Sequence, residues 1–144
     1  MSDLRETAHN SEAPTALLRV RMSSSEARYA GGLVDGASIT ALFGDLATEL
    51  SIRHDGDEGL FRAYEEIEFL APVHAGDYIE ARAWLLHVGH TSRRVAFEAW
   101  KQITAAPEAG DSAAAVLPAP VLVARAVGTV VTPLERQRRL PTTA

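Results

Sequence analysis

The hydrophobic positions between residues 36 and 53 follow a helical period. Apolar side chains recur there at intervals of three and four residues, which places them on one stripe of an α-helix. Asp35 precedes the segment as an N-cap residue, and the turn-forming residues 54–57 follow it. The pattern predicts one helix of about five turns, whose buried stripe consists of Ile39, Leu42, Phe43, Leu46 and Leu50.

The other periodic segments are typical of β-strands, because apolar and polar side chains alternate in them with a period of two. Five strands are predicted, over residues 17–22, 59–70, 77–88, 92–104 and 121–132. The third and fourth should form a hairpin across 89–91. Residues 105–120, rich in Ala, Pro and Gly, are expected to be a loop. This order of elements predicts an α+β fold in which an antiparallel sheet packs on one long helix.

The length of 144 residues fits one domain with its own core. We expect a flexible leader over 1–15, a folded domain over 16–133 and a flexible basic tail over 134–144. The leader lacks the apolar block of a secretory signal, and no run of eighteen apolar residues predicts a membrane span. The absence of cysteine excludes disulfides, thiolate metal sites and a cysteine nucleophile, and it favours a cytoplasmic location.

The charge balance narrows the choice of partners. Fourteen basic residues against nineteen acidic ones give a net charge of −5, which disfavours binding to nucleic acids or to anionic membranes. None of the five histidines forms an i, i+4 pair on the predicted helix, so no metal site is expected. A small-molecule substrate is the remaining expectation.

Several segments of the chain resemble a known enzyme family. The stretch Phe69–Asp77, which follows a long helix and one strand and precedes a hairpin, resembles the hotdog fold of acyl-CoA thioesterases and dehydratases. More narrowly, the chain resembles the hotdog-fold 3-aminobutyryl-CoA ammonia-lyases, relatives of the β-alanyl-CoA ammonia-lyases. The segments that carry this resemblance are 21–27, 33–37, 42–45, 47–50, 55–61, Gly89, 91–93 and 97–99. The chain departs from the family pattern at Arg28, Ala30 and Gly32, in the loop before the helix.

The resemblance implies a hotdog fold, with the sheet wrapped around the helix, and a lyase that removes or adds ammonia at C3 of a short 3-aminoacyl-CoA thioester. An example is the conversion of 3-aminobutyryl-CoA to crotonyl-CoA in lysine degradation. It implies no cofactor besides the coenzyme A of the substrate. We also expect a homo-oligomer, a dimer or a multiple of dimers, because the sheet leaves open edges to cover. An acyl-CoA thioesterase and a non-catalytic acyl-CoA-binding module are the alternatives.

Such a reaction needs a base for the C2 proton and an acid for the leaving nitrogen. Asp45 and Glu49 are four residues apart, so they lie on one flank of the helix. Our hypothesis makes Glu49 the base, because it lies nearer the apolar stripe, and assigns Asp45 to the nitrogen side. The roles are open to reversal, and the competing interpretation is that both carboxylates simply face water.

The predicted helix N-terminus offers further candidates. The backbone N–H groups of Gly36 and Ala37 are expected to bind the thioester oxygen, helped by the helix dipole. Asp35 and Tyr29 complete the catalytic set, although Asp35 is also explained as an N-cap and Tyr29 as a packing residue. On the strand over 59–70, three polar side chains share one face and are candidates to reach substrate or partner, or to be solvated: Tyr64, Glu66 and Glu68.

Coenzyme A carries phosphates, which an acidic protein must meet with local positive charge. The predicted hairpin turn offers hydroxyl groups and two guanidinium groups suited to phosphate, from Thr91, Ser92, Arg93 and Arg94. A solvated basic turn is the competing interpretation. A second basic cluster lies in the predicted tail, at Arg136, Arg138 and Arg139.

Overall fold

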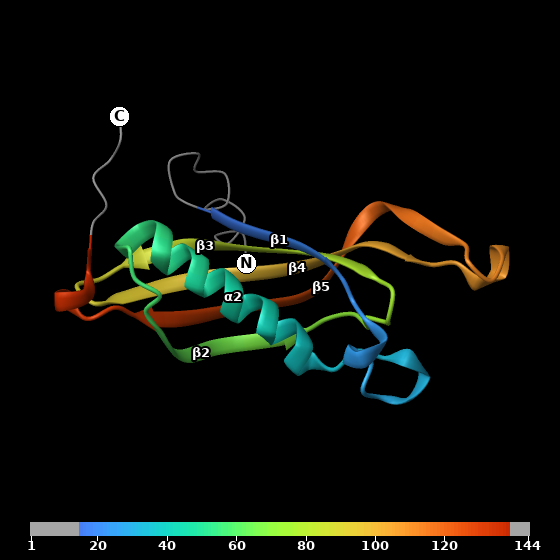
Figure 1. Cartoon of the computed structure of the whole chain (residues 1–144), viewed down its shortest axis with the longest axis horizontal. Coiled ribbons are helices and arrows are strands. Elements are labelled where there is room, and N and C mark those ends of the chain that lie inside the picture. The colour runs from blue at the N-terminus through green and yellow to red at the C-terminus, as the bar shows by residue number, and fades with distance from the viewer. Residues whose placement is uncertain (1–14, 139–144) are drawn as a thin grey trace.

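The computed structural model describes residues 15–138. Within them, five antiparallel strands form one sheet in the order β1-β3-β4-β5-β2, and helix α2 lies across one face of it (Figure 1). The elements are β1 (Thr15–Arg21), α2 (Gly36–Asp55), β2 (Leu60–Phe69), β3 (Tyr78–Val88), β4 (Ser92–Ala105) and β5 (Ala114–Val131). Short 3₁₀ turns occupy Ser24–Glu26, Ala30–Gly32, Pro107–Ala109 and Leu134–Arg136. No helix among the described residues is long and apolar enough to cross a membrane.

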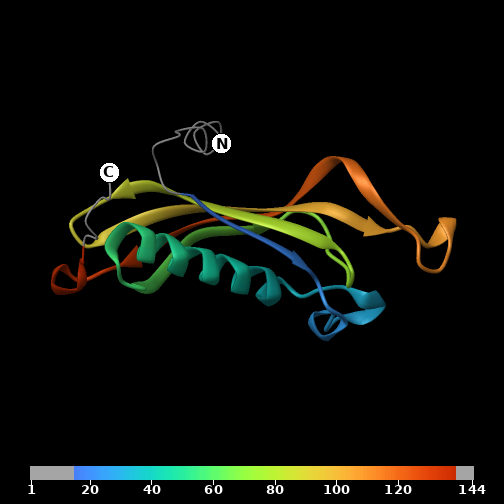
Figure 2. The same cartoon turned by 45° about the horizontal axis from the view of Figure 1, so that its top comes forward.

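Helix α2 forms as its sequence pattern predicts. All five residues of the predicted stripe are buried under the sheet, which curves around the helix (Figure 2). The helix begins after Asp35, whose backbone is extended, and ends where Gly56 adopts φ +68°, a left-handed conformation that glycine accepts without strain. The Gly56 amide donates to the Ile52 carbonyl at 2.9 Å. The helix runs two residues beyond the predicted end, to Asp55.

The core lies between α2 and the middle strands of the sheet. Phe43 of the helix stacks on Phe97 of β4, with ring centroids 5.1 Å apart. Val95, Phe97 and Ala99 all face the helix, as their alternation predicts. Small side chains on the flanking strands let the helix approach the sheet closely: Ala81 and Ala83 on β3, and Ala124 and Ala126 on β5.

Strand β2 departs from the predicted alternation. Two bulges, between Phe61 and Ala63 and between Tyr64 and Glu66, change the spacing of its inward side chains from two to three. Phe61, Tyr64 and Ile67 therefore all pack against the core. The Tyr64 ring lies 4.4 Å from that of Phe61, and burial raises the pKa of its hydroxyl. The prediction that Tyr64 shares an outward face with Glu66 and Glu68 is wrong.

Half of the loop predicted over 105–120 is strand. Strand β5 begins at Ala114 and pairs with β4 from that residue, so the two form a β-arm that extends past the rest of the sheet, while only residues 106–113 connect them (Figure 1). Pro118 and Pro120 fall in the register break between the pairs Lys101–Val121 and Ile103–Val116, where a strand tolerates a missing N–H. Composition indicated a loop here, but cross-strand pairing overrides composition.

A buried ion pair fastens the C-terminus of α2 to the turn between β3 and β4. Arg93, only 3% exposed, donates from Nε and Nη2 to the two carboxylate oxygens of Asp55 at 3.0 and 2.9 Å. Its Nη1 donates to the Gly89 carbonyl at 2.8 Å. Burial by itself raises the pKa of Asp55, but the hydrogen bonds and charge of Arg93 outweigh it and hold that pKa below the ordinary 3.8.

The first residues of the predicted basic tail lie against this same end of the helix. The backbone N–H of Arg138 donates to the Asp55 carbonyl at 2.7 Å, and the Gln137 side chain donates to the His90 carbonyl, also at 2.7 Å. Arg139 and the rest of that segment, like residues 1–14 of the predicted leader, lie outside the described residues.

We predict that Arg93→Met lowers the free energy of unfolding by about 3–5 kcal/mol at neutral pH, because it leaves a buried carboxylate without its partner. In the variant, burial raises the pKa of Asp55 and only the smaller effects of His54 and Thr132 oppose it, so we expect the folded-state pKa to lie above the unfolded one. The contribution of Asp55 to the stability of the variant then falls as pH rises, whereas in the wild-type protein it increases. The difference in unfolding free energy between the two proteins should therefore shrink as the pH is lowered through 3.8. Urea unfolding at several pH values measures both effects.

The matched control is Arg94→Met, which breaks the exposed pair between Arg94 and Glu65. Exposed pairs contribute little, so this variant should unfold close to wild type. Equal losses of unfolding free energy in the two variants would show that burying the pair of Asp55 and Arg93 does not increase its contribution to stability.

Candidate active site

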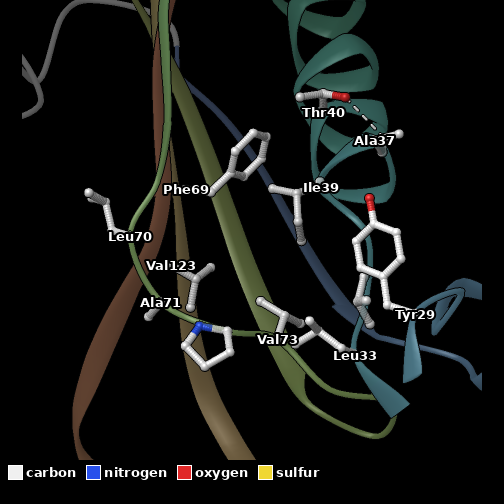
Figure 3. Close-up of a pocket in the computed structure, with 13 residues that line it drawn as sticks. Tyr29, Leu33, Ala37, Ile39, Thr40, Phe69, Leu70, Ala71, Val73 and Val123 are labelled. Atoms are coloured by element: carbon white, nitrogen blue, oxygen red, sulfur yellow. Dashed lines mark hydrogen bonds between the residues drawn. The ribbon is translucent and has the colours of Figure 1, made fainter. Parts of the chain in front are cut away.

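A pocket of about 730 Å³ opens at the N-terminus of α2 (Figure 3). It lies between the first turn of the helix, the loop before it and the segment that follows β2. The lining is mostly apolar and consists of Tyr29, Leu33, Val34, Gly36, Ala37, Ile39, Thr40, Phe69, Leu70, Ala71, Pro72, Val73 and Val123. The pocket contains the predicted residues of the helix N-terminus, but most of its wall was not identified from the sequence.

The first amides of α2 are available to a ligand. Asp35 stands at the N-cap position, yet its carboxylate makes no capping hydrogen bond to the helix backbone. It accepts instead from the Ser38 hydroxyl at 2.7 Å, and an Arg28 nitrogen lies 3.8 Å from its other oxygen. The N–H groups of Gly36 and Ala37 therefore have no side-chain cap, and the helix dipole gives them affinity for a negatively charged or polarised oxygen.

Hydroxyl groups are the only polar side-chain groups of the lining. Tyr29 is 57% exposed, and its hydroxyl lies beside the first turn of α2 (Figure 3). Thr40 donates its hydroxyl hydrogen to the Ala37 carbonyl at 3.0 Å. None of the thirteen lining residues is a carboxylate, and buried Asp35 is not among them. The pocket of one chain thus offers apolar walls and two uncapped amides, and none of its lining residues could act as a carboxylate base.

The predicted carboxylates lie farther along the helix. Asp45 and Glu49 are nine and thirteen residues past Gly36, a rise of about 14 and 20 Å. Asp45 is exposed, while Glu49 is partly buried and accepts a hydrogen bond from Arg53 Nε at 2.8 Å. This confirms that Glu49 lies nearer the apolar stripe. The structure does not bring either carboxylate to the pocket of its own chain.

Comparison with known proteins agrees with this geometry. The family model of the thioesterase superfamily matches residues 31–107. The chain is 53% identical over 124 residues to the 3-aminobutyryl-CoA ammonia lyase of Acetoanaerobium sticklandii, which covers 86% of this chain and 98% of the relative. It superposes on the β-alanyl-CoA:ammonia lyase from Clostridium propionicum with a TM-score of 0.84 and 38% identity, covering 88% and 90% of the two chains. The chain belongs to the CoA-thioester ammonia-lyases of the thioesterase superfamily.

The predicted hotdog fold and the predicted class, a carbon–nitrogen lyase, are confirmed by these relatives. A hexameric hotdog-fold thioesterase of Campylobacter jejuni, 17% identical with a TM-score of 0.68 over 85% of this chain and 86% of that one, shares the fold alone. The ammonia-lyase relatives, not this distant neighbour, distinguish the lyase from the thioesterase alternative.

The turn predicted to bind phosphate lies at the opposite end of the lyase from the pocket. Because Arg93 is buried and its guanidinium is occupied by Asp55, the prediction that Arg93 contacts coenzyme A is wrong. Arg94 is half-exposed and paired with Glu65, and Thr91 and Ser92 are partly exposed beside it. The partner of Arg93 is 38 residues away in the sequence, so local spacing gave no signal of it.

A side chain on the first residue of the lyase helix would press against the opposite wall of the pocket. A Cβ atom on Gly36 would lie 2.8 Å from Cζ of Phe69, whose ring covers the first turn of α2 from the opposite wall of the pocket (Figure 3). Real Cβ atoms do not approach a carbon so closely, so Gly36 is what allows Phe69 to reach the helix backbone.

We predict that Gly36→Ala displaces the Phe69 ring and weakens thioester binding, with an overpacking cost of about 1–3 kcal/mol. Each 1.4 kcal/mol corresponds to a tenfold higher Kd, which titration calorimetry with butyryl-CoA measures. The double variant Gly36→Ala/Phe69→Leu makes room for the methyl group and should recover part of the loss. If the double variant binds no better than Gly36→Ala, the contact with Phe69 is not the cause.

Proposed function

We propose that this protein eliminates ammonia from C3 of a short 3-aminoacyl-CoA thioester and adds it in the reverse direction, as between 3-aminobutyryl-CoA and crotonyl-CoA. The observation that carries the proposal is the apolar pocket that ends on the uncapped amides of Gly36 and Ala37. The identity to the 3-aminobutyryl-CoA enzyme supports the choice of acyl group. The proposal includes a role in lysine degradation and a cytoplasmic location, and it requires no cofactor.

The elimination passes through an enolate-like state, in which negative charge grows on the thioester oxygen as the C2 proton leaves. In this proposal the amides of Gly36 and Ala37 donate to that oxygen, because donors fixed in advance stabilise developing charge without reorganisation. Loss of the C3 nitrogen then forms the double bond, and the nitrogen takes up a proton. The apolar walls, from Ile39 to Val123, surround the short acyl chain and limit access of water to the carbonyl carbon.

The acid and the base come, in this proposal, from a second copy of the chain. Ala37 and Ala41 are exposed on the flank of α2 that continues to Asp45, and their small side chains leave room for a neighbouring helix. If two copies pack their helices antiparallel about a two-fold axis, the later turns of one helix lie beside the first turn of the other. Glu49 then reaches the C2 proton in the other copy's pocket, and Asp45 serves the nitrogen.

The antiparallel pairing of helices from two copies also leads to a revised proposal for where coenzyme A binds. The turn that bears Arg94 lies near the C-terminal end of α2, roughly 30 Å from the pocket of its own chain, since twenty residues rise 1.5 Å each. Across a two-fold axis it lies near the other pocket, where Thr91, Ser92 and Arg94 bind phosphate and Tyr29 contacts the acyl or amine group. Hexameric hotdog relatives support a homo-oligomer built from such pairs.

We predict that Glu49→Gln and Asp45→Asn each lower the rate of ammonia addition to crotonyl-CoA by about 10²–10⁴-fold, the usual contribution of a general acid or base. Loss of enoyl absorbance follows the addition, and a thiol reagent detects any hydrolysis. Exchange of the C2 proton in deuterated buffer assigns the roles, because only loss of the base stops it. Glu108→Gln, at the exposed tip of the β-arm, is the control and should retain full activity.

A mixing experiment tests whether the site is shared between copies. Co-expressed Gly36→Val and Glu49→Gln chains form some mixed pairs, each with one intact site, so about a quarter of all sites should be active after random pairing. Each variant alone should be nearly inactive. A monomer by light scattering, or no recovery in mixed pairs that are shown to form, would contradict the shared site.

A further inference from the structure

Lys101 is the only lysine of the chain, and it lies behind the wall of the pocket. It belongs to β4, opposite Val121 of β5, and its side chain is only 12% exposed. Its Nζ donates to the carbonyl of Pro72 at 2.6 Å. Pro72 lines the pocket, so the lysine is one residue removed from the space where the acyl chain binds.

The ammonium group is paired with a fully buried carboxylate. Asp77 is 0% exposed, and its Oδ2 lies 3.2 Å from Lys101 Nζ. The same oxygen accepts the backbone N–H of His74 at 2.8 Å, while Oδ1 accepts the hydroxyl of Thr104 at 2.7 Å. A buried carboxylate so fully bonded fixes every group that donates to it.

These contacts hold a segment that has no regular structure of its own. Residues 70–75 follow β2 and precede β3, so few of their carbonyls have ladder partners. The Leu70 amide donates to Val123 at 2.8 Å at one end, and Asp77 fixes His74 at the other. Between these ends, Lys101 holds the Pro72 carbonyl.

The segment also holds the loop that leads into α2. The Val73 carbonyl accepts the N–H of Val34 at 2.8 Å, and the Ala75 N–H donates to Gly32 at 3.0 Å. A shift of the segment therefore moves both walls of the pocket, the one that carries Phe69 and the one that carries Gly36. Because these walls bound the pocket, their separation affects how large an acyl group fits between them.

We propose that Lys101, through Asp77 and Pro72, is a positioning residue that sets the acyl-chain length accepted by the pocket. This inference rests on the proposed function, since it concerns how the same pocket selects among CoA thioesters. Lys101 does not contact the substrate. It keeps the wall close to the helix, so that a four-carbon acyl group is bound and a six-carbon group is disfavoured.

The test compares Lys101→Met with Lys101→Arg. Methionine keeps the length of the stem but removes the charge and the donors. The ratio of kcat/KM for crotonyl-CoA over 2-hexenoyl-CoA should therefore fall about tenfold, which corresponds to about 1.4 kcal/mol, close to the contribution of one charged hydrogen bond. Arginine retains a charged donor and should restore much of the ratio. Glu108→Gln, at the exposed tip of the β-arm, is the control and should leave the ratio unchanged.

A second measurement does not depend on whether Lys101→Met folds well. Because the chain has one lysine, ¹⁵N labelling at lysine Nζ gives a single side-chain ammonium signal from the wild-type protein. Saturating butyryl-CoA should shift this signal, whereas coenzyme A without an acyl group should not. Calorimetry on the same sample shows whether butyryl-CoA binds.

The outcomes separate the two proposals. If butyryl-CoA binds without moving the Nζ signal, or if Lys101→Met lowers the melting temperature but leaves the chain-length ratio unchanged, the lysine is merely structural and the inference is overturned. If the wild-type protein does not bind butyryl-CoA at all, the proposed function fails, and the inference fails with it.

Discussion

The distance between α2 and the sheet determines what the two ends of the helix can do. Stacking of Phe43 on Phe97, over strands that offer alanine on either side, seats the middle of the helix against the sheet. With the middle fixed, the first turn must meet the segment after β2, and the last turn must meet the β3–β4 turn. The pocket and the buried Asp55 pair are therefore two consequences of one packing contact.

Two of the buried charge pairs in this protein anchor irregular backbone. Asp55 with Arg93 holds the turn between β3 and β4, and Asp77 with Lys101 holds the segment that walls the pocket. Both aspartates are almost fully buried, and each accepts several hydrogen bonds that satisfy its oxygens. Such pairs add little net stability over apolar residues of the same shape, but breaking either pair leaves a charge without a partner. Their contribution is to fix geometry.

The sequence predicted those parts of the fold that depend on local periodicity. The stripe of α2 and the alternation of β4 lie as expected, because each reflects contacts repeated along one element. The bulges that turn Tyr64 inward and the pairing that makes residues 114–120 part of a strand depend on neighbouring strands. A single-strand pattern cannot show them. For this reason the outward face of β2 and the loop over 105–120 were predicted wrongly.

The site was also predicted only in part, because some of its contacts join residues that are far apart in the sequence. Gly36, Ala37 and Tyr29 are close in sequence and meet at one pocket. The wall that faces them arrives from residues 69–73, more than thirty positions later, and Arg93 is removed from the phosphate-binding set by a partner 38 residues away. Asp45 and Glu49 share a helix flank as predicted. They lie away from the pocket because several helical turns separate them from the start of the helix.

The engagement of Lys101 also has a chemical consequence. An α,β-unsaturated thioester is an electrophile at C3, and the amines and thiols of proteins attack it as readily as ammonia does. This chain has no cysteine, and its single lysine is held between Asp77 and the Pro72 carbonyl, facing away from the pocket's contents. A site that must deliver ammonia to such a carbon is thereby kept free of thiols and side-chain amines that the unsaturated thioester would alkylate.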